Sequence, residues 1–228
     1  MMLRKWEDMP QFMKCKEVKY YYDILKKKRM ELLIKRIFDL VVSFILLMIL
    51  AIPMGIIALL IKLDSPGPIF FRQERITAYG RKFKIHKFRT RVNNADKIGA
   101  AVTTSGDARI TKIGSKLRDL RLDEIPQLID VLNGDMSFVG TRPEVTKYVK
   151  KYTKEMRETL LLPAGITSEA SIKYKDEAVL LKNTFDLDRV YIEEILPAKM
   201  KYNLKSIREF SFIRDIITMV ETALAVLG

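Results

Sequence analysis

Two adjacent acids and a later arginine are the residues of this chain best suited to do chemistry. The acids, Asp123 and Glu124, precede Pro126, and a Thr-Arg-Pro turn further along carries Arg142. Proline is tolerated in the first turn of a helix, so Pro126 predicts a helix that starts near the acid pair and runs to Leu132. The free amides and the dipole at such a start stabilise anions. Basic side chains stand just upstream, at Lys116, Arg118 and Arg121.

These residue types together suit chemistry on a phosphate. An ionised aspartate beside a divalent cation and arginines can attack phosphorus and form an acyl phosphate. The guanidinium of Arg142, presented by a rigid turn, has the fork that matches a phosphate. Structural ion pairing of the same side chains is the alternative. The sequence has neither a Walker A lysine loop nor a paired-glycine dinucleotide motif, so ATP-driven chemistry is unsupported.

Composition narrows the choice of partners and of metals. The 228 residues contain 41 Lys and Arg against 28 Asp and Glu, a formal net charge of +13, which favours anionic partners. Cys15 is the single cysteine and reads as a bystander thiol, and His86 is the single histidine. The single cysteine excludes an internal disulfide and a multi-cysteine zinc site. With one histidine, neither a His-based metal site nor a Ser-His-Asp triad is expected within the chain. A metal here would be oxygen-ligated and similar to Mg²⁺.

Residues 40–61, LVVSFILLMILAIPMGIIALLI, carry no charge and are long enough to enter a bilayer. A buried helix of a soluble protein is the alternative, although such helices are rarely apolar on every face. Pro53 removes a backbone amide and predicts a kink. Both flanks are basic, and basic flanks favour the cytoplasmic side. A re-entrant helix–break–helix satisfies both flanks, and a single-pass span is the alternative. Asp39 is expected at headgroup depth, beside Lys35 or Arg36.

The first 36 residues carry 11 Lys and Arg and 5 Asp and Glu, and a run of three tyrosines precedes Lys26. Aromatic and basic side chains together suit a membrane–water interface, and a solvated basic helix is the alternative. This segment does not read as a secretory signal, because the apolar run starts too late and no cleavage site follows it.

The remainder reads as one compact domain. Residues 69–76 and 82–90 predict a small antiparallel hairpin around a turn at Tyr79-Gly80-Arg81. The polar residues 93–104 predict a loop or a short helix. Helices are expected at 112–120, 144–162, 186–200 (ending at Pro197) and 210–227, with modest strand character at 167–175.

Six motifs follow one another within residues 33–168: KRIFDLVVS at 35–43, LDSPGPIFFRQER at 63–75, KFRT at 87–90, DARIT at 107–111, RLDEIPQL at 121–128 and NGDMSFVGTRPE at 133–144. In this order they resemble the bacterial sugar transferases of the polyprenyl-phosphate hexose-1-phosphate transferase type, also called small monotopic phosphoglycosyl transferases. The resemblance implies transfer of a sugar-1-phosphate from a UDP-sugar to a polyprenyl phosphate such as undecaprenyl phosphate. UMP would be released, in the first membrane step of glycoconjugate or exopolysaccharide synthesis.

The resemblance also implies roles for individual residues. Asp123 would be the nucleophile that forms a covalent phosphosugar intermediate in a ping-pong reaction. Glu124 would support it, and both acids would hold Mg²⁺. The resemblance implies a re-entrant membrane helix kinked at a proline, here Pro53. Phosphate or nucleotide binding is expected of Lys87, Arg89, Arg118, Arg142 and Pro143.

The expected fold is α-rich α+β: a basic extension (1–32), a re-entrant membrane helix (33–63) and a catalytic domain (64–228) with a small antiparallel hairpin and amphipathic interfacial helices. The expected partners are a UDP-sugar, a polyprenyl phosphate and the bacterial inner (cytoplasmic) membrane, with the catalytic domain facing the cytoplasm. Nucleic acid is not expected, and a homo-oligomer is left open.

Two departures from the family pattern bear on these expectations. The kink is Ile52-Pro53 where the family commonly has Ser-Pro, and AGIT at 164–167 continues as SEASIKYKDE instead of a stretch rich in glycine and glutamine. Two other classes of function compete with the enzyme. The basic hairpin and the net charge suit a membrane-bound module that binds nucleic acid or anionic lipid, and the apolar segment suits a single-pass envelope scaffold.

Overall fold

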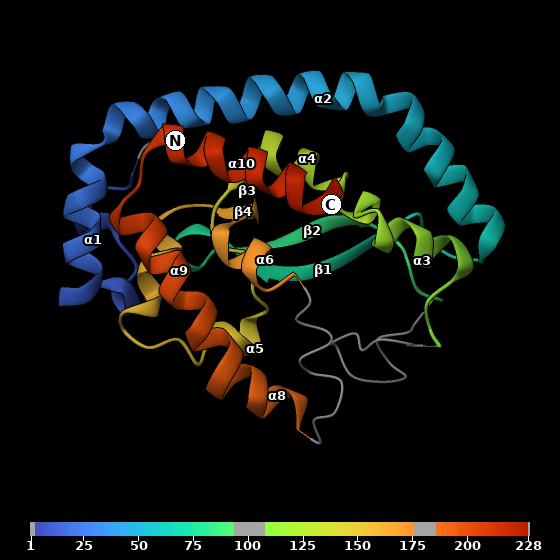
Figure 1. Ribbon diagram of the computed structural model, residues 1–228. Coiled ribbons are helices and arrows are strands. Elements are labelled where there is room, and N and C mark those ends of the chain that lie inside the picture. Colours follow the sequence, from blue (N-terminus) through green and yellow to red (C-terminus); the bar gives the residue numbers. More distant parts are fainter. Residues whose placement is uncertain (1–2, 94–107, 176–185, 228) are drawn as a thin grey trace.

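The computed structural model describes residues 3–93, 108–175 and 186–227. Most of these residues are helical, and the strands among them form two separate two-stranded sheets. A long helix, α2 (Arg29–Asp64), arches over one side of the other elements (Figure 1). Both sheets lie beneath this arch and are surrounded by shorter helices. The expectation of a helix-rich protein with a small antiparallel hairpin is confirmed.

The hairpin consists of β1 (Phe70–Ile76) and β2 (Lys82–Phe88), paired antiparallel with Arg75 opposite Phe83. Its turn places Tyr79 at φ 60° and Gly80 at φ 74°, in the left-handed region. Residues opposite one another in such a pair point to the same face. Arg75 on β1 and Lys87 on β2 therefore share one face of the hairpin, and this face also carries the buried Phe83.

The second sheet is a parallel pair that the sequence analysis did not foresee. It joins β3 (Met136–Val139) to β4 (Ala164–Thr167). Gly140, which follows β3, lies against Gly165 within β4. A Cβ atom on Gly165 would lie 2.1 Å from the backbone nitrogen of Gly140. Only glycine fits such an approach. The chain leaves β3 at this point and enters the turn that carries Arg142.

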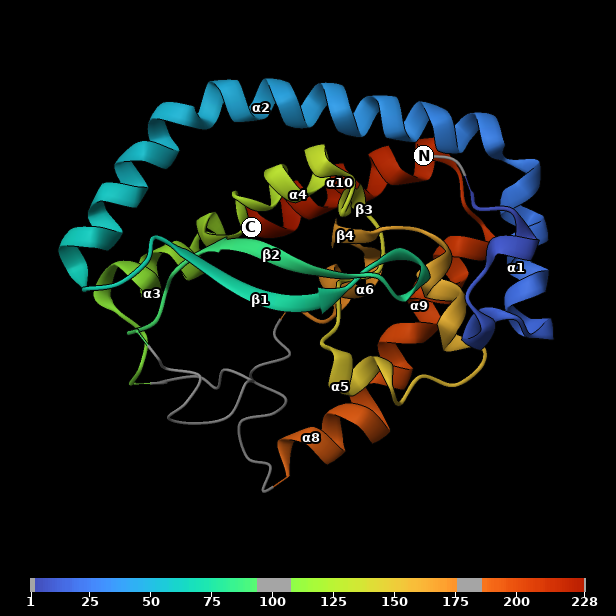
Figure 2. The same ribbon diagram turned by 180° about the vertical axis from the view of Figure 1, so that it is seen from behind.

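The remaining helical elements surround these strands (Figure 2). The α-helices are α1 (Lys16–Lys27), α3 (Lys112–Asp119), α4 (Gln127–Asn133), α5 (Thr146–Val149), α6 (Glu169–Lys173), α8 (Leu187–Val190), α9 (Leu196–Arg208) and α10 (Phe212–Leu227). A π-helical segment, Tyr191–Ile195, joins α8 to α9. Single 3₁₀ turns or short 3₁₀ segments lie at Trp6–Asp8, Gln11–Met13, Ala78–Gly80, Leu122–Glu124 and Met156–Leu161.

The basic N-terminal extension packs into the domain through its apolar side chains. Val18, Tyr22 and Leu25 of α1 are buried in one core cluster with residues of α9 and of the 3₁₀ segment Met156–Leu161. The extension is therefore not a freely solvated helix. The family-like motifs begin after it, so this segment adds core that the motifs themselves do not supply.

The first half of α2 is attached to the domain by its own charged side chains. Lys35 pairs with Asp215 of α10, and Arg36 donates to two carbonyls in the last turn of α4 at 2.7 and 3.0 Å. Asp39 accepts the backbone amide of Phe138 in β3 at 3.3 Å. The expected pairing of Asp39 with Lys35 or Arg36 is wrong, because the backbone of β3 supplies its partner and Asp39 is buried against it. Its depth in a membrane stays a prediction.

The C-terminal end of α2 is attached to the same domain. Arg89 donates to the carbonyls of Ser65 (2.6 Å) and Pro66 (2.7 Å), and the amide of Ile113 in α3 donates to Asp64 (3.1 Å). Between its two attachments α2 exposes a continuous apolar surface. Its most exposed side chains include Ile37, Val41, Phe44, Met48, Ile49, Ile52, Ile56, Leu59 and Leu63.

The helix–break–helix expected around Pro53 is not present, because the chain stays helical from Arg29 to Asp64. The helix is curved instead, and its second half bends toward α3 (Figure 1). Within the described residues, α2 is the helix long and apolar enough to cross a membrane.

Other boundaries also differ from the expected ones. The helix expected over 144–162 is split into α5 and the segment Met156–Leu161, whose side chains pack under α1. The strand near 167–175 lies earlier, as β4, and α6 follows it. Pro197 does not end the helix expected over 186–200, because it stands in the first turn of α9, where no amide is needed. The expected helices at 112–120 and 210–227 are confirmed as α3 and α10. Of the polar stretch 93–104, only Asn93 lies in the described residues.

Candidate active site

Glu124 is the centre of a compact cluster of opposite charges. Its Oε1 atom accepts from Nζ of Lys87 at 2.6 Å and from Nη2 of Arg142 at 2.6 Å. Its Oε2 atom has one long contact to Arg142, at 3.5 Å. The Glu124 side chain is only 14% exposed and that of Lys87 only 19%. The structure thus brings together three of the residues predicted from the sequence, from three separate elements.

Asp123, the neighbouring acid, is held differently. Within the described residues its carboxylate has no hydrogen bond and no ion-pair partner. Lys87, Arg118 and Arg142 are nevertheless close enough to act on it electrostatically. Glu124 is therefore fixed by its neighbours, whereas the Asp123 carboxylate lies among cations and keeps its oxygens available.

The acid pair lies in the 3₁₀ turn Leu122–Glu124, which Arg121 starts from the left-handed region (φ 56°). The helix expected to begin at the pair, α4, begins four residues later, at Gln127, with Pro126 as its N-cap residue. The argument from the amides and dipole of this helix is therefore wrong. Side-chain cations, not a helix start, surround these carboxylates. The predicted closing Asn-Gly is confirmed, since Gly134 ends α4 at φ 81°.

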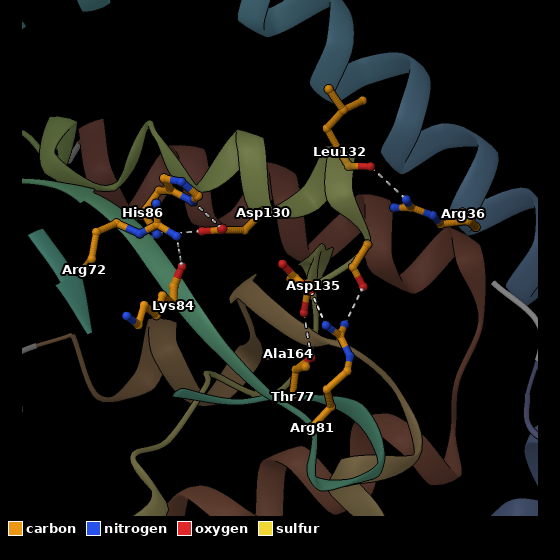
Figure 3. A network of polar contacts seen from close by, with 11 residues as sticks. Arg36, Arg72, Thr77, Arg81, Lys84, His86, Asp130, Leu132, Asp135 and Ala164 are labelled. Carbon is orange, nitrogen blue, oxygen red and sulfur yellow. Dashed lines mark hydrogen bonds and ion pairs between the residues drawn. The ribbon is translucent and has the colours of Figure 1, made fainter. Parts of the chain in front are cut away.

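A buried pair fixes β2 against α4 and so places Lys87. Asp130, in the middle of α4, is fully buried. One of its oxygens accepts the backbone amide of His86 at 2.8 Å, and the other meets Nδ1 of the same residue at 2.6 Å (Figure 3). Because Lys87 is the next residue along β2, this double contact sets its position opposite Glu124. Burial raises the pKa of the Asp130 carboxyl, and both contacts with His86 oppose that rise.

The end of α4 is bound from two further sides (Figure 3). Arg36 of α2 reaches its last carbonyls, and Arg81 of the hairpin turn pairs with Asp135. The hydroxyl of Thr77 donates to the carbonyl of Asp135 at 2.6 Å and accepts the amide of Ala164 at 3.2 Å. The hairpin, α2 and the parallel sheet are thereby joined around the helix that follows the acid pair.

The two carboxyls differ in pKa because of their neighbours. Burial alone would raise the pKa of Glu124, but Arg142 and Lys87 outweigh it and hold the pKa well below its usual range. Burial raises the pKa of Asp123, Lys87 opposes the rise and Glu124 adds to it. Burial also lowers the pKa of Lys87, and the negative charge of Glu124 opposes this lowering. An ionised Glu124 and a more basic Asp123 carboxylate follow from this arrangement.

The other residues predicted for the site are placed less closely. Arg118, in α3, acts on Asp123 electrostatically. Pro143 is buried, and its carbonyl accepts from Arg75 at 3.1 Å. Arg89 is directed to the carbonyls of Ser65 and Pro66, just after the end of α2, and is not part of the Glu124 cluster. Its predicted role in phosphate binding stays a prediction, and its observed contacts hold the membrane-type helix.

Sequence reasoning missed four residues that support the cluster: Arg75, Asp130, Glu144 and Tyr191. Arg75 was seen only as a basic residue of the hairpin, although its position on the same face as Lys87 follows from the strand register. An acid such as Asp130, in the apolar stretch after the pair, was a signal for a buried polar contact. Tyr191 carried no local signal, because its partner is 47 residues away in the chain.

Comparison with known sequences agrees with the motif reading. The profile of the bacterial sugar transferase family matches residues 30–228. A UDP-N-acetylgalactosamine-undecaprenyl-phosphate N-acetylgalactosaminephosphotransferase of Aeromonas hydrophila is 34% identical over 198 residues, which are 85% of this chain and 44% of that protein. A UDP-glucose:undecaprenyl-phosphate glucose-1-phosphate transferase of Escherichia coli is 35% identical over 189 residues, 81% of this chain and 38% of that protein.

A protein of Xanthomonas campestris with the same name as the Escherichia coli relative is 36% identical over 199 residues, 85% of this chain and 39% of its own length. The chain thus spans less than half the length of these three relatives. The family match covers every element from α2 to α10, including the acid pair and its cations. The chain is a member of the bacterial sugar transferase family.

Proposed function

We propose that the protein transfers a sugar-1-phosphate from a UDP-sugar to a polyprenyl phosphate such as undecaprenyl phosphate and releases UMP. The observation that carries this proposal is the contrast within the acid pair. Glu124 is held by Lys87 and Arg142, while the half-buried Asp123 lies among cations without a hydrogen bond in the described residues. The names of the relatives give the substrate class, since they act on undecaprenyl phosphate.

The proposed chemistry has two halves. An ionised oxygen of Asp123 attacks the β-phosphorus of the UDP-sugar, the bond to the bridging oxygen breaks, and UMP leaves with that oxygen. The product is a covalent phosphosugar on the aspartate. A phosphate oxygen of the lipid then attacks the same phosphorus, and the Asp123 carboxylate leaves. The lipid carries away a sugar diphosphate, and the enzyme returns to its first state, so the reaction is ping-pong.

The cations have a defined task in both halves. Negative charge on the diphosphate and on the departing UMP must be stabilised as the bond breaks. Lys87 and Arg142 are already oriented by Glu124, so little reorganisation is needed when an anion arrives. Burial raises the pKa of Asp123, which makes its ionised carboxylate a better nucleophile, and Lys87 opposes the rise and so favours the ionised form.

The acid pair also fits Mg²⁺, which we propose as the cofactor. Mg²⁺ in phosphoryl-transfer sites is held by one or two carboxylates together with substrate phosphates and water. No group of three His, Cys, Asp or Glu side chains suited to a metal occurs in the described residues. Asp123 and the Oε2 atom of Glu124, which has only its long contact, would hold the ion. It would supply charge neutralisation on the diphosphate.

We further propose that α2 enters the membrane and returns on the same side, with the domain on the cytoplasmic face of the inner membrane. Both ends of α2 are hydrogen-bonded to one domain, through Arg36 at one end and Arg89 at the other. A straight crossing would have to break one of these attachments. The exposed apolar middle of the arch would then be the part in lipid.

Cysteine labelling tests this topology. Single cysteines at the exposed Met30 and Leu63 positions, in a Cys15→Ser background, should both react with an impermeant reagent only from the cytoplasmic side. Labelling of the two positions from opposite sides would refute the re-entrant arrangement and support a single pass.

UMP release tests the function itself. With at least one UDP-sugar, the purified protein in detergent or nanodiscs should release at most one UMP per enzyme molecule without lipid. Repeated turnover should occur only when undecaprenyl phosphate is added. A screen of UDP-sugars identifies the donor, for which the relatives named for N-acetylgalactosamine and for glucose provide the first candidates. Salt-sensitive binding of these ligands without UMP release would instead support a binding module.

A further inference from the structure

The turn that carries Arg142 is bound on two sides by residues that do not themselves reach the acid pair. The turn comprises residues 141–144 and leaves the parallel sheet beside Gly165, whose amide donates to the carbonyl of Thr141 at 2.9 Å. Arg142 meets Glu124 from this turn. A side chain that must meet a phosphate within a fraction of an ångström depends on the backbone that presents it.

The first set of hydrogen bonds to this turn comes from β1. Nη1 of Arg75 donates to the carbonyl of Pro143 at 3.1 Å, and Nη2 donates to the side chain of Gln73 at 2.6 Å. The backbone amide of the next residue, Ile76, donates to the carbonyl of Glu144 at 2.9 Å. Burial lowers the pKa of Arg75, and the negative charge of Glu144 opposes this shift. The guanidinium of Arg75 thus joins the hairpin to the turn.

The second contact with this turn comes from the π-helical segment between α8 and α9. The hydroxyl of Tyr191 donates to Oε1 of Glu144, and both residues are buried. The ammonium of Lys199 lies 3.4 Å from that hydroxyl and 5.4 Å from the centroid of the Tyr191 ring. π-helical turns are rare and are often found at functional sites, because they re-aim one side chain. Here the re-aimed side chain reaches the turn of Arg142.

We propose that Arg75 and Tyr191 are positioning residues that act on the reaction through Arg142. The inference rests on the proposed function, since it concerns how Arg142 meets a phosphate. Neither residue is placed to contact substrate itself. Both terminal nitrogens of Arg75 have protein partners, and Tyr191 is 4% exposed. Their removal loosens the turn from one side while leaving Arg142 in the protein.

Two substitutions test this with little loss of volume. Tyr191→Phe removes only the hydroxyl that holds Glu144. Arg75→Lys keeps the positive charge but replaces a two-pronged donor by a point charge, which cannot hold Pro143 and Gln73 together. Each is expected to lower kcat/KM for UMP release by about tenfold and to weaken the binding of UDP.

Matched controls separate positioning from stability. Tyr148→Phe also removes the hydroxyl of a buried tyrosine, one bound to Asp188, from a ring whose centroid lies 4.5 Å from that of Tyr191. Arg72→Lys changes a neighbouring arginine of β1 that donates to a carbonyl within the hairpin. Both controls are expected to keep kcat/KM within twofold of the wild type, and the thermal midpoints of Tyr148→Phe and Tyr191→Phe are expected to fall by similar amounts.

A double-mutant cycle with Arg142→Gln decides the proposal. UDP affinity is measured by titration calorimetry, so the comparison does not need turnover in the weakest variants. If Arg75 and Tyr191 act through Arg142, their substitutions change the affinity by less than twofold once Arg142 is gone. Equal losses in both backgrounds would overturn the proposal, as would full activity of both single variants. A wild type that neither binds UDP nor releases UMP would overturn the proposed function together with this inference.

Discussion

Two buried glutamates of this protein lie in opposite electrostatic surroundings. Glu124, in the acid pair, is 14% exposed, and Lys87 and Arg142 hold its pKa well below the usual range. Glu158, under α1, is fully buried, and within the described residues no cation bonds to its oxygens. Burial raises the pKa of Glu158 to about 9, the nearby charge of Glu155 adds to the rise, and Tyr21 opposes it. Two cations, not the degree of burial, therefore decide which glutamate carries a charge.

The comparison distinguishes a glutamate of the candidate active site, Glu124, from a glutamate of the core, Glu158. Two cations lie beside Glu124, Lys87 from β2 and Arg142 from the turn after β3, and burial there disfavours the charged form of Lys87. Among the described residues no cation acts on Glu158 in this way, so its side chain stays protonated near neutral pH and packs as a neutral group beside Tyr21. A ligand with several negative charges would be attracted to the cations around Glu124. The surroundings of Glu158 offer such a ligand no favourable electrostatic interaction.

The largest expected effect comes from Asp123, the acid beside Glu124 whose carboxylate has no hydrogen bond within the described residues. Asp123→Asn removes the attacking oxygen charge with almost no change of shape, so UMP release should fall about a thousandfold or more. Circular dichroism and the thermal midpoint should stay close to those of the wild type. Turnover near the wild-type rate would show that Asp123 is not the nucleophile.

Glu124→Gln removes the negative charge that lies between Lys87 and Arg142. The amide cannot balance Lys87 and Arg142, which then repel one another and lose their orientation. We expect about a hundredfold loss of kcat/KM, measured by UMP release. Glu158→Gln is the matched control, because it makes the same change at the uncharged side and should keep full activity. Equal activity of the two variants would contradict the contrast between the two environments.

The pH dependence of kcat/KM sharpens the same contrast. Activity should fall as pH falls through the raised pKa of Asp123, because only the carboxylate attacks. Lys87 opposes this rise in pKa, so Lys87→Met should move the acidic limb of the profile to higher pH. Glu124 adds to the rise, so Glu124→Gln should move the limb to lower pH. Shifts in the same direction would contradict the assignment of the limb to Asp123.

The smallest expected effect is on stability at Glu158. Its folded-state pKa of about 9 lies above the ordinary glutamate value, so the folded state keeps a proton that the unfolded state loses as pH rises. The free energy of unfolding therefore declines between about pH 4.5 and pH 9. Glu158→Gln removes this decline and should raise the thermal midpoint at pH 8 by about 2–4 °C, with little change at pH 4.5. An equal shift at both pH values would contradict the raised pKa.

The sequence was sufficient for features that depend on local chemistry. The hairpin followed from alternating apolar residues around Tyr79-Gly80, α3 and α10 from helical periodicity, and the membrane-type helix from its uncharged run. The motifs identified Lys87, Glu124 and Arg142, and the structure brings both cations within hydrogen-bond distance of Glu124. In each case the signal lay within a few residues or in a family pattern.

Features that depend on distant partners were not predictable. The helix start expected at Asp123 is a 3₁₀ turn, because Arg121 takes a left-handed conformation that nothing in its neighbours requires. The helix break expected at Pro53 is absent: α2 stays helical from Arg29 to Asp64, and near both ends it is held by residues distant in the chain. The helix expected over 144–162 is interrupted where it packs under α1, a segment about 130 residues earlier in the chain.

Peptide mass spectrometry of the protein tests the central claim most directly. The protein is mixed with the UDP-sugar donor in the absence of lipid acceptor, quenched and digested. We predict an added mass of one phosphosugar on the peptide that contains Asp123, its loss when undecaprenyl phosphate is supplied, and no adduct in Asp123→Asn. Turnover by the wild type with no adduct, or with an adduct on a different residue, would contradict the account.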